Sequence, residues 1–109
     1  MLLNFDTLPS LTTPNFKGGE KEYTQSFFLD ELCRIMKGRL IPGASIGEHC
    51  HEASSEIIYV LSGTGSVICN GEAETVLPGQ CHYCPKGSTH TLKNNGIEDL
   101  VFFAVVPIQ

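Results

Sequence analysis

The chain has 109 residues, of which 41% are hydrophobic and 17% are charged, and its net charge is −5. This length suits one domain, and the composition is that of a globular protein rather than a disordered one. The seven basic residues are scattered along the chain, so we expect no nucleic-acid partner, because nucleic-acid binding requires several cations on one face.

The start of the chain and its apolar runs argue against export and against a membrane span. The first residues lack the positively charged region and apolar core of a secretory signal. The longest apolar run, Leu100–Val106, is far shorter than the ~20 residues that cross a bilayer. Five cysteines, an odd number, indicate a reducing compartment rather than a disulfide framework. We therefore expect a soluble, cytoplasmic protein with no membrane partner.

Turn signals recur at the spacing that is typical of an all-β barrel or sandwich. Residues 1–16 are expected to form an N-terminal arm or an edge strand, and residues 17–109 a single barrel domain. Runs rich in β-branched and aromatic residues are predicted as strands or parts of strands. These runs are Glu22–Phe28, Cys33–Ile41, Ile57–Leu61, Tyr83–Cys84 and Leu100–Val106.

Two local signals lie between these strands. Asn70-Gly71 tolerates the two positive φ angles of a type I′ turn, so Ser66–Cys69 and Glu72–Val76 are predicted to form a hairpin. Residues 29–36 allow a helical turn as an alternative to a strand, but the segment is too short for a stable helix. The signals together predict strands joined by short turns.

The candidate functional residues begin with His49-Cys50-His51. Residues two apart on a strand face the same side, so both imidazoles project together and Cys50 points the other way. Such a pair alone is equally explained by two surface or hydrogen-bonded histidines. Glu56 follows across a predicted tight turn, and His90 lies in an alternating segment that can aim its imidazole into a barrel. Three imidazoles and one carboxylate suit one divalent transition metal ion (Fe, Mn, Ni, Zn, Co or Cu), whose identity stays open.

Glycine, proline, histidine, glutamate and asparagine recur at fixed intervals between residues 43 and 94. The first motif of the cupin family resembles the stretch Gly43-x5-His49-x-His51-x4-Glu56-x6-Gly63. The second resembles Gly79-x5-Pro85-x-Gly87-x2-His90-x3-Asn94. The resemblance implies an all-β fold, a conical double-stranded β-helix or jelly-roll-like barrel. It also implies that the four metal ligands are His49, His51, Glu56 and His90.

A second group of polar residues has ordinary explanations. Residues 81–84 read Cys-His-Tyr-Cys, which has the CxxC spacing of redox and zinc sites. On a strand, residues three apart face opposite sides, so we expect buried cysteine of the ordinary kind rather than such a site. His82 is expected to be a surface histidine.

The four candidate ligands leave one or two positions of a metal ion for water or substrate, as in catalytic sites. A dication with one carboxylate ligand keeps about one positive charge, which favours an anionic ligand. We therefore favour a metal-dependent enzyme that acts on a small, anionic organic molecule. The cupin resemblance allows the dioxygenase, isomerase, decarboxylase and lyase types. The alternative is a sugar- or metabolite-binding or sensing module without turnover.

Two further points of function follow from the chain as a whole. No general base stands out, so the catalytic residues remain unknown. The resemblance also implies a homodimer, and an apolar outer face on Leu100–Val106 suits that arrangement.

Overall fold

Short strands and tight turns alternate along the chain in the computed structural model, which describes residues 1–109. One 3₁₀ turn, η1 (Phe16–Gly18), interrupts them. No helix is long and apolar enough to cross a membrane. The strands in chain order are β1 (Ser10–Pro14), β2 (Glu22–Leu29), β3 (Cys33–Leu40), β4 (Ser45–Cys50), β5 (Glu56–Ser62), β6 (Gly65–Cys69), β7 (Glu72–Val76), β8 (Cys81–Cys84), β9 (Thr89–Lys93) and β10 (Leu100–Pro107).

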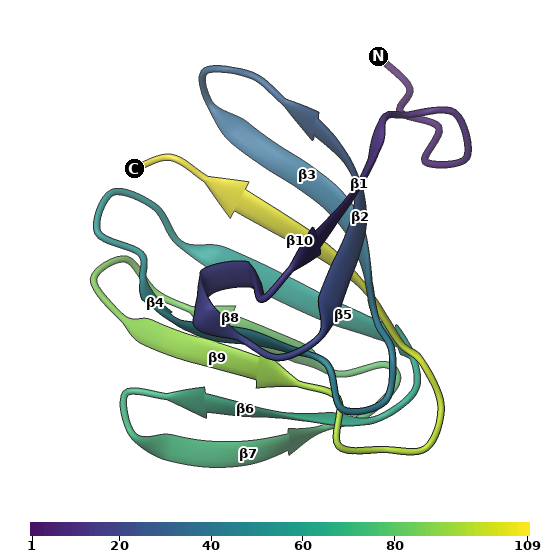
Figure 1. The fold of residues 1–109 in the computed structure, drawn as a ribbon. Coiled ribbons are helices and arrows are strands. Elements are labelled where there is room, and N and C mark those ends of the chain that lie inside the picture. Colours follow the sequence, from purple (N-terminus) through teal and green to yellow (C-terminus); the bar gives the residue numbers. More distant parts are fainter.

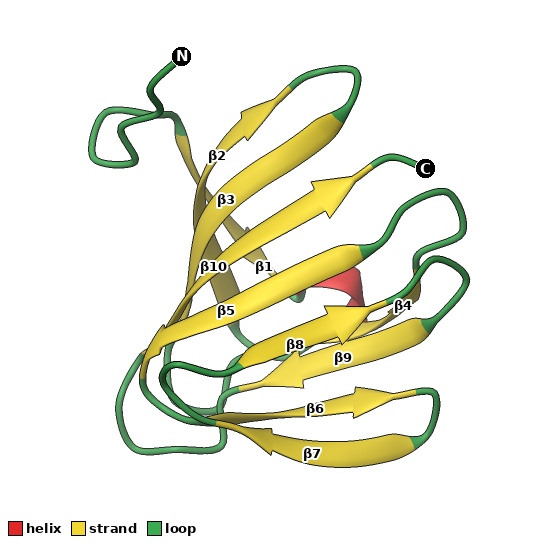
Figure 2. Cartoon of the chain, turned by 180° about the vertical axis from the view of Figure 1, so that it is seen from behind, coloured by secondary structure: helices red, strands yellow, loops and turns green.

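The strands form two antiparallel sheets that face each other across one interior (Figures 1 and 2). The larger sheet has the strand order β1-β2-β3-β10-β5-β8, and the smaller has the order β4-β9-β6-β7. Strands that are neighbours in a sheet are often distant in the sequence, as β3 and β10 are. The predicted all-β double-stranded barrel is therefore confirmed.

The predicted strands and hairpin are present with small shifts at their ends. Asn70 and Gly71 have φ angles of 51° and 83°, as a type I′ turn requires, and they join β6 to β7. The alternative of a helical turn at residues 29–36 is wrong. The Asp30 carboxylate instead accepts the backbone N–H groups of Leu32 and Cys33, which closes a tight turn before β3.

The expected N-terminal arm contributes an edge strand. Within it, β1 pairs with β2 from Ser10 opposite Ser26 to Pro14 opposite Glu22. Because β1 has no neighbour on its other side, it ends the larger sheet. The proline at its end is tolerated there, since an edge strand does not need every N–H for pairing.

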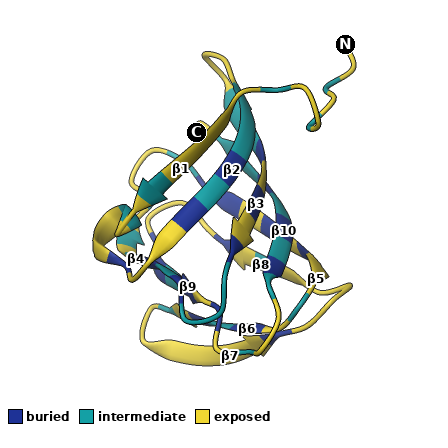
Figure 3. Cartoon of the chain, turned by 45° about the vertical axis from the view of Figure 1, so that its right-hand side comes forward, coloured by how far each residue is buried: buried dark blue, intermediate teal, exposed yellow.

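Buried residues alternate with more exposed ones along the strands (Figure 3). The interior that they form is apolar at one end and polar at the other. On β5, Ile58 and Val60 are buried in the core, and Glu56 faces the same interior at the start of the strand. On β9, Leu92 belongs to the core and His90 lies two residues before it. The polar end of the barrel therefore holds a carboxylate and an imidazole that face each other from different sheets.

Candidate metal centre

A β-bulge in β4 aims His49 into the barrel. Pairing with β9 continues from Ile46 to His49 with one residue more on β4 than on β9. The extra residue shifts the alternation, so Ile46 faces the core and His49 also faces the interior although the two are three residues apart. Gly47 lies in the bulge, where a Cβ would collide with the carbonyl oxygen of Lys17 in η1. Only glycine lets the two backbones approach this closely.

The bulge also sets the tautomer of the His49 ring. Its Nδ1 lies 2.8 Å from the carbonyl oxygen of Gly47, which can only accept a hydrogen bond. Nδ1 therefore carries the proton, and Nε2 presents its lone pair to the interior. His51 is held in a similar way, with its Nδ1 2.9 Å from the Ser54 hydroxyl. Its backbone is hydrogen-bonded to Ser88 and Gly87, in the loop before β9.

The structure brings all four predicted ligand residues together: His49, His51, Glu56 and His90. The Nε2 atoms of His51 and His90 lie 3.1 and 3.0 Å from Glu56 Oε1. His90 Nε2 also lies 3.0 Å from His51 Nε2 and 3.1 Å from His49 Nε2. Donor atoms at right angles on one ion, each about 2.1 Å from it, are ~3 Å apart. The four side chains thus have the spacing and the donor types for one metal ion.

Glu56 is ionised in this setting. Burial opposes its ionisation, but the contacts with His49, His51 and His90 outweigh burial and hold the pKa of the carboxyl well below its usual range. Cys50, which lies between His49 and His51 in the chain, is exposed and does not belong to the group, as the sequence predicted. The group is therefore one carboxylate facing three imidazoles, which a cation would neutralise and bridge.

His82 was missed as part of this centre, and the expectation of a surface histidine is wrong. It is half-buried, and its Nε2 lies 2.9 Å from Nδ1 of His90. Burial and then the neighbouring His90 lower the pKa of His82, so its ring is neutral and can accept the Nδ1 proton of His90. That hydrogen bond leaves the lone pair of His90 on Nε2, facing the other three donors. Support of this kind orients metal-binding histidines in many sites.

The alternation of side chains along β8 explains why His82 faces inward. It lies opposite Ile58 of β5, a core residue, and residues opposite each other share one face of a sheet. The Cys-His-Tyr-Cys segment divides accordingly, with Cys81 exposed and Cys84 buried. The sequence predicts this opposition of the two cysteines, but it does not reveal that β8 lies beside β5.

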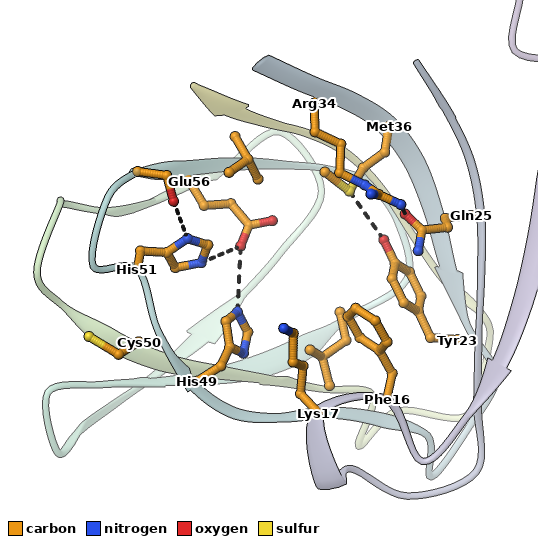
Figure 4. Close-up of a pocket in the computed structure, with 13 residues that line it drawn as sticks. Phe16, Lys17, Tyr23, Gln25, Arg34, Met36, His49, Cys50, His51 and Glu56 are labelled. Carbon is orange, nitrogen blue, oxygen red and sulfur yellow. Dashed lines mark hydrogen bonds and ion pairs between the residues drawn. The ribbon is translucent and has the colours of Figure 1, made fainter. Parts of the chain in front are cut away.

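The donor group opens on a cavity of about 320 Å³ (Figure 4). His49, His51 and Glu56 line one side of it, and His90 closes the group from behind at 1% exposure. Two cationic side chains that the sequence did not single out also line the cavity: Arg34 lies across it from the donor group, and Lys17 lies beside His49. Any further ligand of a bound ion would therefore enter a space with two positive charges on its wall.

Arg34 is held in place by its surroundings on the larger sheet. Its guanidinium donates a hydrogen bond of 3.0 Å to Gln25 Oε1 and lies 4.3 Å over the ring of Phe27. Gln25 is itself 2% exposed and cannot move freely. Nearby, burial raises the pKa of Tyr23, which stays protonated and donates to the sulfur of Met36. This wall of the cavity thus offers donors of hydrogen bonds and no carboxylate.

A barrel of two antiparallel sheets with three histidines and a glutamate converging inside it defines a class of small β-barrel proteins with a possible metal site. The chain belongs to the cupin family, since the model of the cupin domain matches residues 36–106.

Proteins similar to this chain come from several organisms. A curated relative, the oxalate-binding protein of Thermotoga maritima, is 34% identical in an alignment over 98 residues that covers 84% of this chain and 81% of that protein. A crystal structure from Thermotoga maritima, described as a predicted oxalate decarboxylase, superposes with a TM-score of 0.93 at 29% identity and covers 100% of both chains. The cupin domain of Schizosaccharomyces pombe Cnp3 has a TM-score of 0.79 at 12% identity, covering 97% of this chain and 72% of that one. The last comparison shows the fold alone.

Proposed function

We propose that this protein binds a divalent transition metal ion through His49, His51, Glu56 and His90, and uses the ion to hold a small dicarboxylate such as oxalate. The observation that carries the proposal is the composition of one cavity wall. Donor residues lie on one side of the cavity, Arg34 lies on the other, and Lys17 lines the cavity beside His49. A dicarboxylate has one anionic group for each side.

The charges around the cavity support a dianion. A dication with Glu56 as its carboxylate ligand keeps one positive charge. Arg34 and Lys17 raise the total to three, and Glu56 is the one carboxylate among the residues that line the cavity. Arginine presents a planar fork of N–H groups that matches a carboxylate in two hydrogen bonds. Two oxygens of the ligand then face the ion and two face the guanidinium.

The relatives agree with this chemistry. The oxalate-binding protein of Thermotoga maritima carries the ligand in its name, and it covers most of this chain at 34% identity. A cavity of about 320 Å³ lies at the low end of ligand pockets, which suits a molecule of a few heavy atoms.

The test is a calorimetric titration of the protein with oxalate, before and after removal of metal by a chelator. We expect oxalate binding in the Mn(II)-loaded protein and a loss of at least about tenfold in affinity without metal, because the ion supplies half of the contacts. Acetate, with one carboxylate, serves as the matched control and should bind more weakly than oxalate. Equal affinity for oxalate with and without metal would contradict the proposal.

Turnover of the bound anion is the second candidate function. It is favoured by the position of the donor group, which opens on the cavity rather than on packed core. When bound there, an ion would act as a Lewis acid toward the carboxylate. The same Mn(II)-loaded sample, incubated with oxalate, tests this candidate through the release of formate and carbon dioxide. Binding without either product would leave a binding module.

We also propose a homodimer that pairs through the outer face of the larger sheet. Ile57, Tyr59 and Tyr83 are exposed there on adjacent strands, at 39%, 43% and 57%. Tyr59 lies opposite Phe103 of β10. A contiguous apolar surface of this kind is typical of an interface between subunits.

Tyr59→Lys is expected to convert the dimer to a monomer, because the lysine charge would be desolvated at the centre of this surface. The molecular mass by light scattering measures the outcome. Ile97→Lys, at a position 94% exposed in a loop, is the control and should leave the mass unchanged. A monomeric mass for the unaltered protein would contradict the proposal.

A further inference from the structure

Two cysteines lie inside the barrel directly beside the residues of the first donor group. Cys69 of β6 is opposite His90 of β9, and Cys84 of β8 is opposite Glu56 of β5. Residues opposite each other on neighbouring strands share a face of the sheet, so both thiols face the interior, one from each sheet. The two strands are not neighbours in either sheet, and only closure of the barrel brings them together.

The two thiols meet a third donor. The sulfur atoms of Cys69 and Cys84 and one ring nitrogen of His82 lie within 4.8 Å of one another. Cys84 is completely buried, and Cys69 and His82 are half-buried. Neither cysteine forms a disulfide. Three donors at this spacing surround a point that is separate from the first group, although His82 contacts both.

The donor types differ from those of the first group. Two sulfurs and one nitrogen form a soft set that prefers Zn(II) or Cu(I) over the harder ions. Zinc sites with two cysteines, one histidine and a fourth open position are known to be stable. His82 lines a second cavity of about 510 Å³, together with Glu74 and Gln80 between β7 and β8. An ion can therefore approach His82 from a side of the barrel that the first cavity does not reach.

The environment of Cys84 is poor for a free thiolate. Burial and the neighbouring Cys69 raise the pKa of the Cys84 thiol to about 12. A bound dication changes this balance, since coordinating thiols are deprotonated by the ion itself.

We propose that Cys69, Cys84 and His82 form a second metal site that binds one thiophilic ion of the Zn(II) class. The two groups meet at His82. Its Nε2 accepts the Nδ1 proton of His90, so His82 would ligate the second ion through Nδ1, whose proton the ion displaces together with the two thiol protons. The barrel then has two sites. The first, with nitrogen and oxygen donors, opens on the first cavity, and the second, with two sulfur donors, lies beside the second cavity.

Cobalt(II) tests this site because it replaces zinc and absorbs in the near ultraviolet when thiolates ligate it. Metal-free, fully reduced protein is titrated anaerobically with Co(II). We expect about two equivalents to bind, one of them with the thiolate-to-cobalt absorption, and Zn(II) to abolish that absorption. Cys69→Ser is expected to bind about one equivalent without the absorption. Binding of one equivalent without any thiolate absorption in the unaltered protein would overturn the proposal.

Two further variants make the result specific. Cys81→Ser changes the exposed cysteine of the same strand and should titrate like the unaltered protein. His49→Ala removes a ligand of the first group alone, so it should keep the thiolate absorption. Because Cys69 is only half-buried, its serine variant stays folded, and the remaining equivalent at the first group reports this. Retention of the absorption in Cys69→Ser, or its loss in Cys81→Ser, would also overturn the proposal.

Discussion

His49→Ala is expected to lower the affinity for Mn(II) or Fe(II) by about 100-fold or more, while the barrel remains folded. Changes in residues that merely support metal ligands cost 10- to 100-fold, roughly, and loss of a donor costs at least as much. His49 lines the cavity, so removal of its imidazole enlarges an existing space rather than opening a hole in the core. Competition against a chelating dye of known affinity measures the change, and the unfolding temperature reports the fold.

Cys50→Ala is the matched control for this variant. Cys50 is the next residue along the chain, is exposed, and lies outside the donor group. We expect the control to bind metal as tightly as the unaltered protein. Unchanged affinity in His49→Ala would exclude His49 as a ligand and would reduce the centre to the three remaining side chains.

The four donors of this centre were predictable from the sequence for two reasons. Three of them are close together in the chain, and the fourth belongs to a recognisable motif. His49 and His51 follow from strand alternation, and Glu56 follows one turn later. His90 came from the resemblance to the second cupin motif, since nothing local links it to residues 49–56. The bulge that lets Ile46 and His49 both face inward was not predictable, because it depends on the pairing of β4 with β9.

The residues that surround the donors could not be found in this way. Arg34 reads as an ordinary charge in a strand. It lies on the same face of β3 as the core residue Met36, and the cavity that it meets there forms only when the two sheets close. Cys69 and Cys84 meet only after the barrel closes, so no sequence spacing connects them. Ligands that are close together in the chain can thus be predicted from the sequence. The residues that surround them cannot, because they come together only in the folded barrel.

Arg34→Ala is expected to lower the affinity of the metal-loaded protein for oxalate roughly 10- to 100-fold, with the metal affinity unchanged. A hydrogen bond to a charged group contributes about 1.5–3 kcal/mol, and Arg34 offers a fork of two such bonds. Arg34→Lys keeps the charge but not the fork, so an intermediate affinity is expected. Calorimetric titration with oxalate measures all three proteins.

Arg39→Ala controls for the loss of a positive charge from the same strand. Arg39 faces outward, and its 3.8 Å contact with Asp99 is exposed, so its removal should change oxalate affinity little. The comparison separates an effect of net charge from one of position. If both variants lost affinity equally, the anion would be attracted by the overall field alone. A loss confined to Arg34 would mean that the wall opposite the metal donors holds the far carboxylate of the ligand.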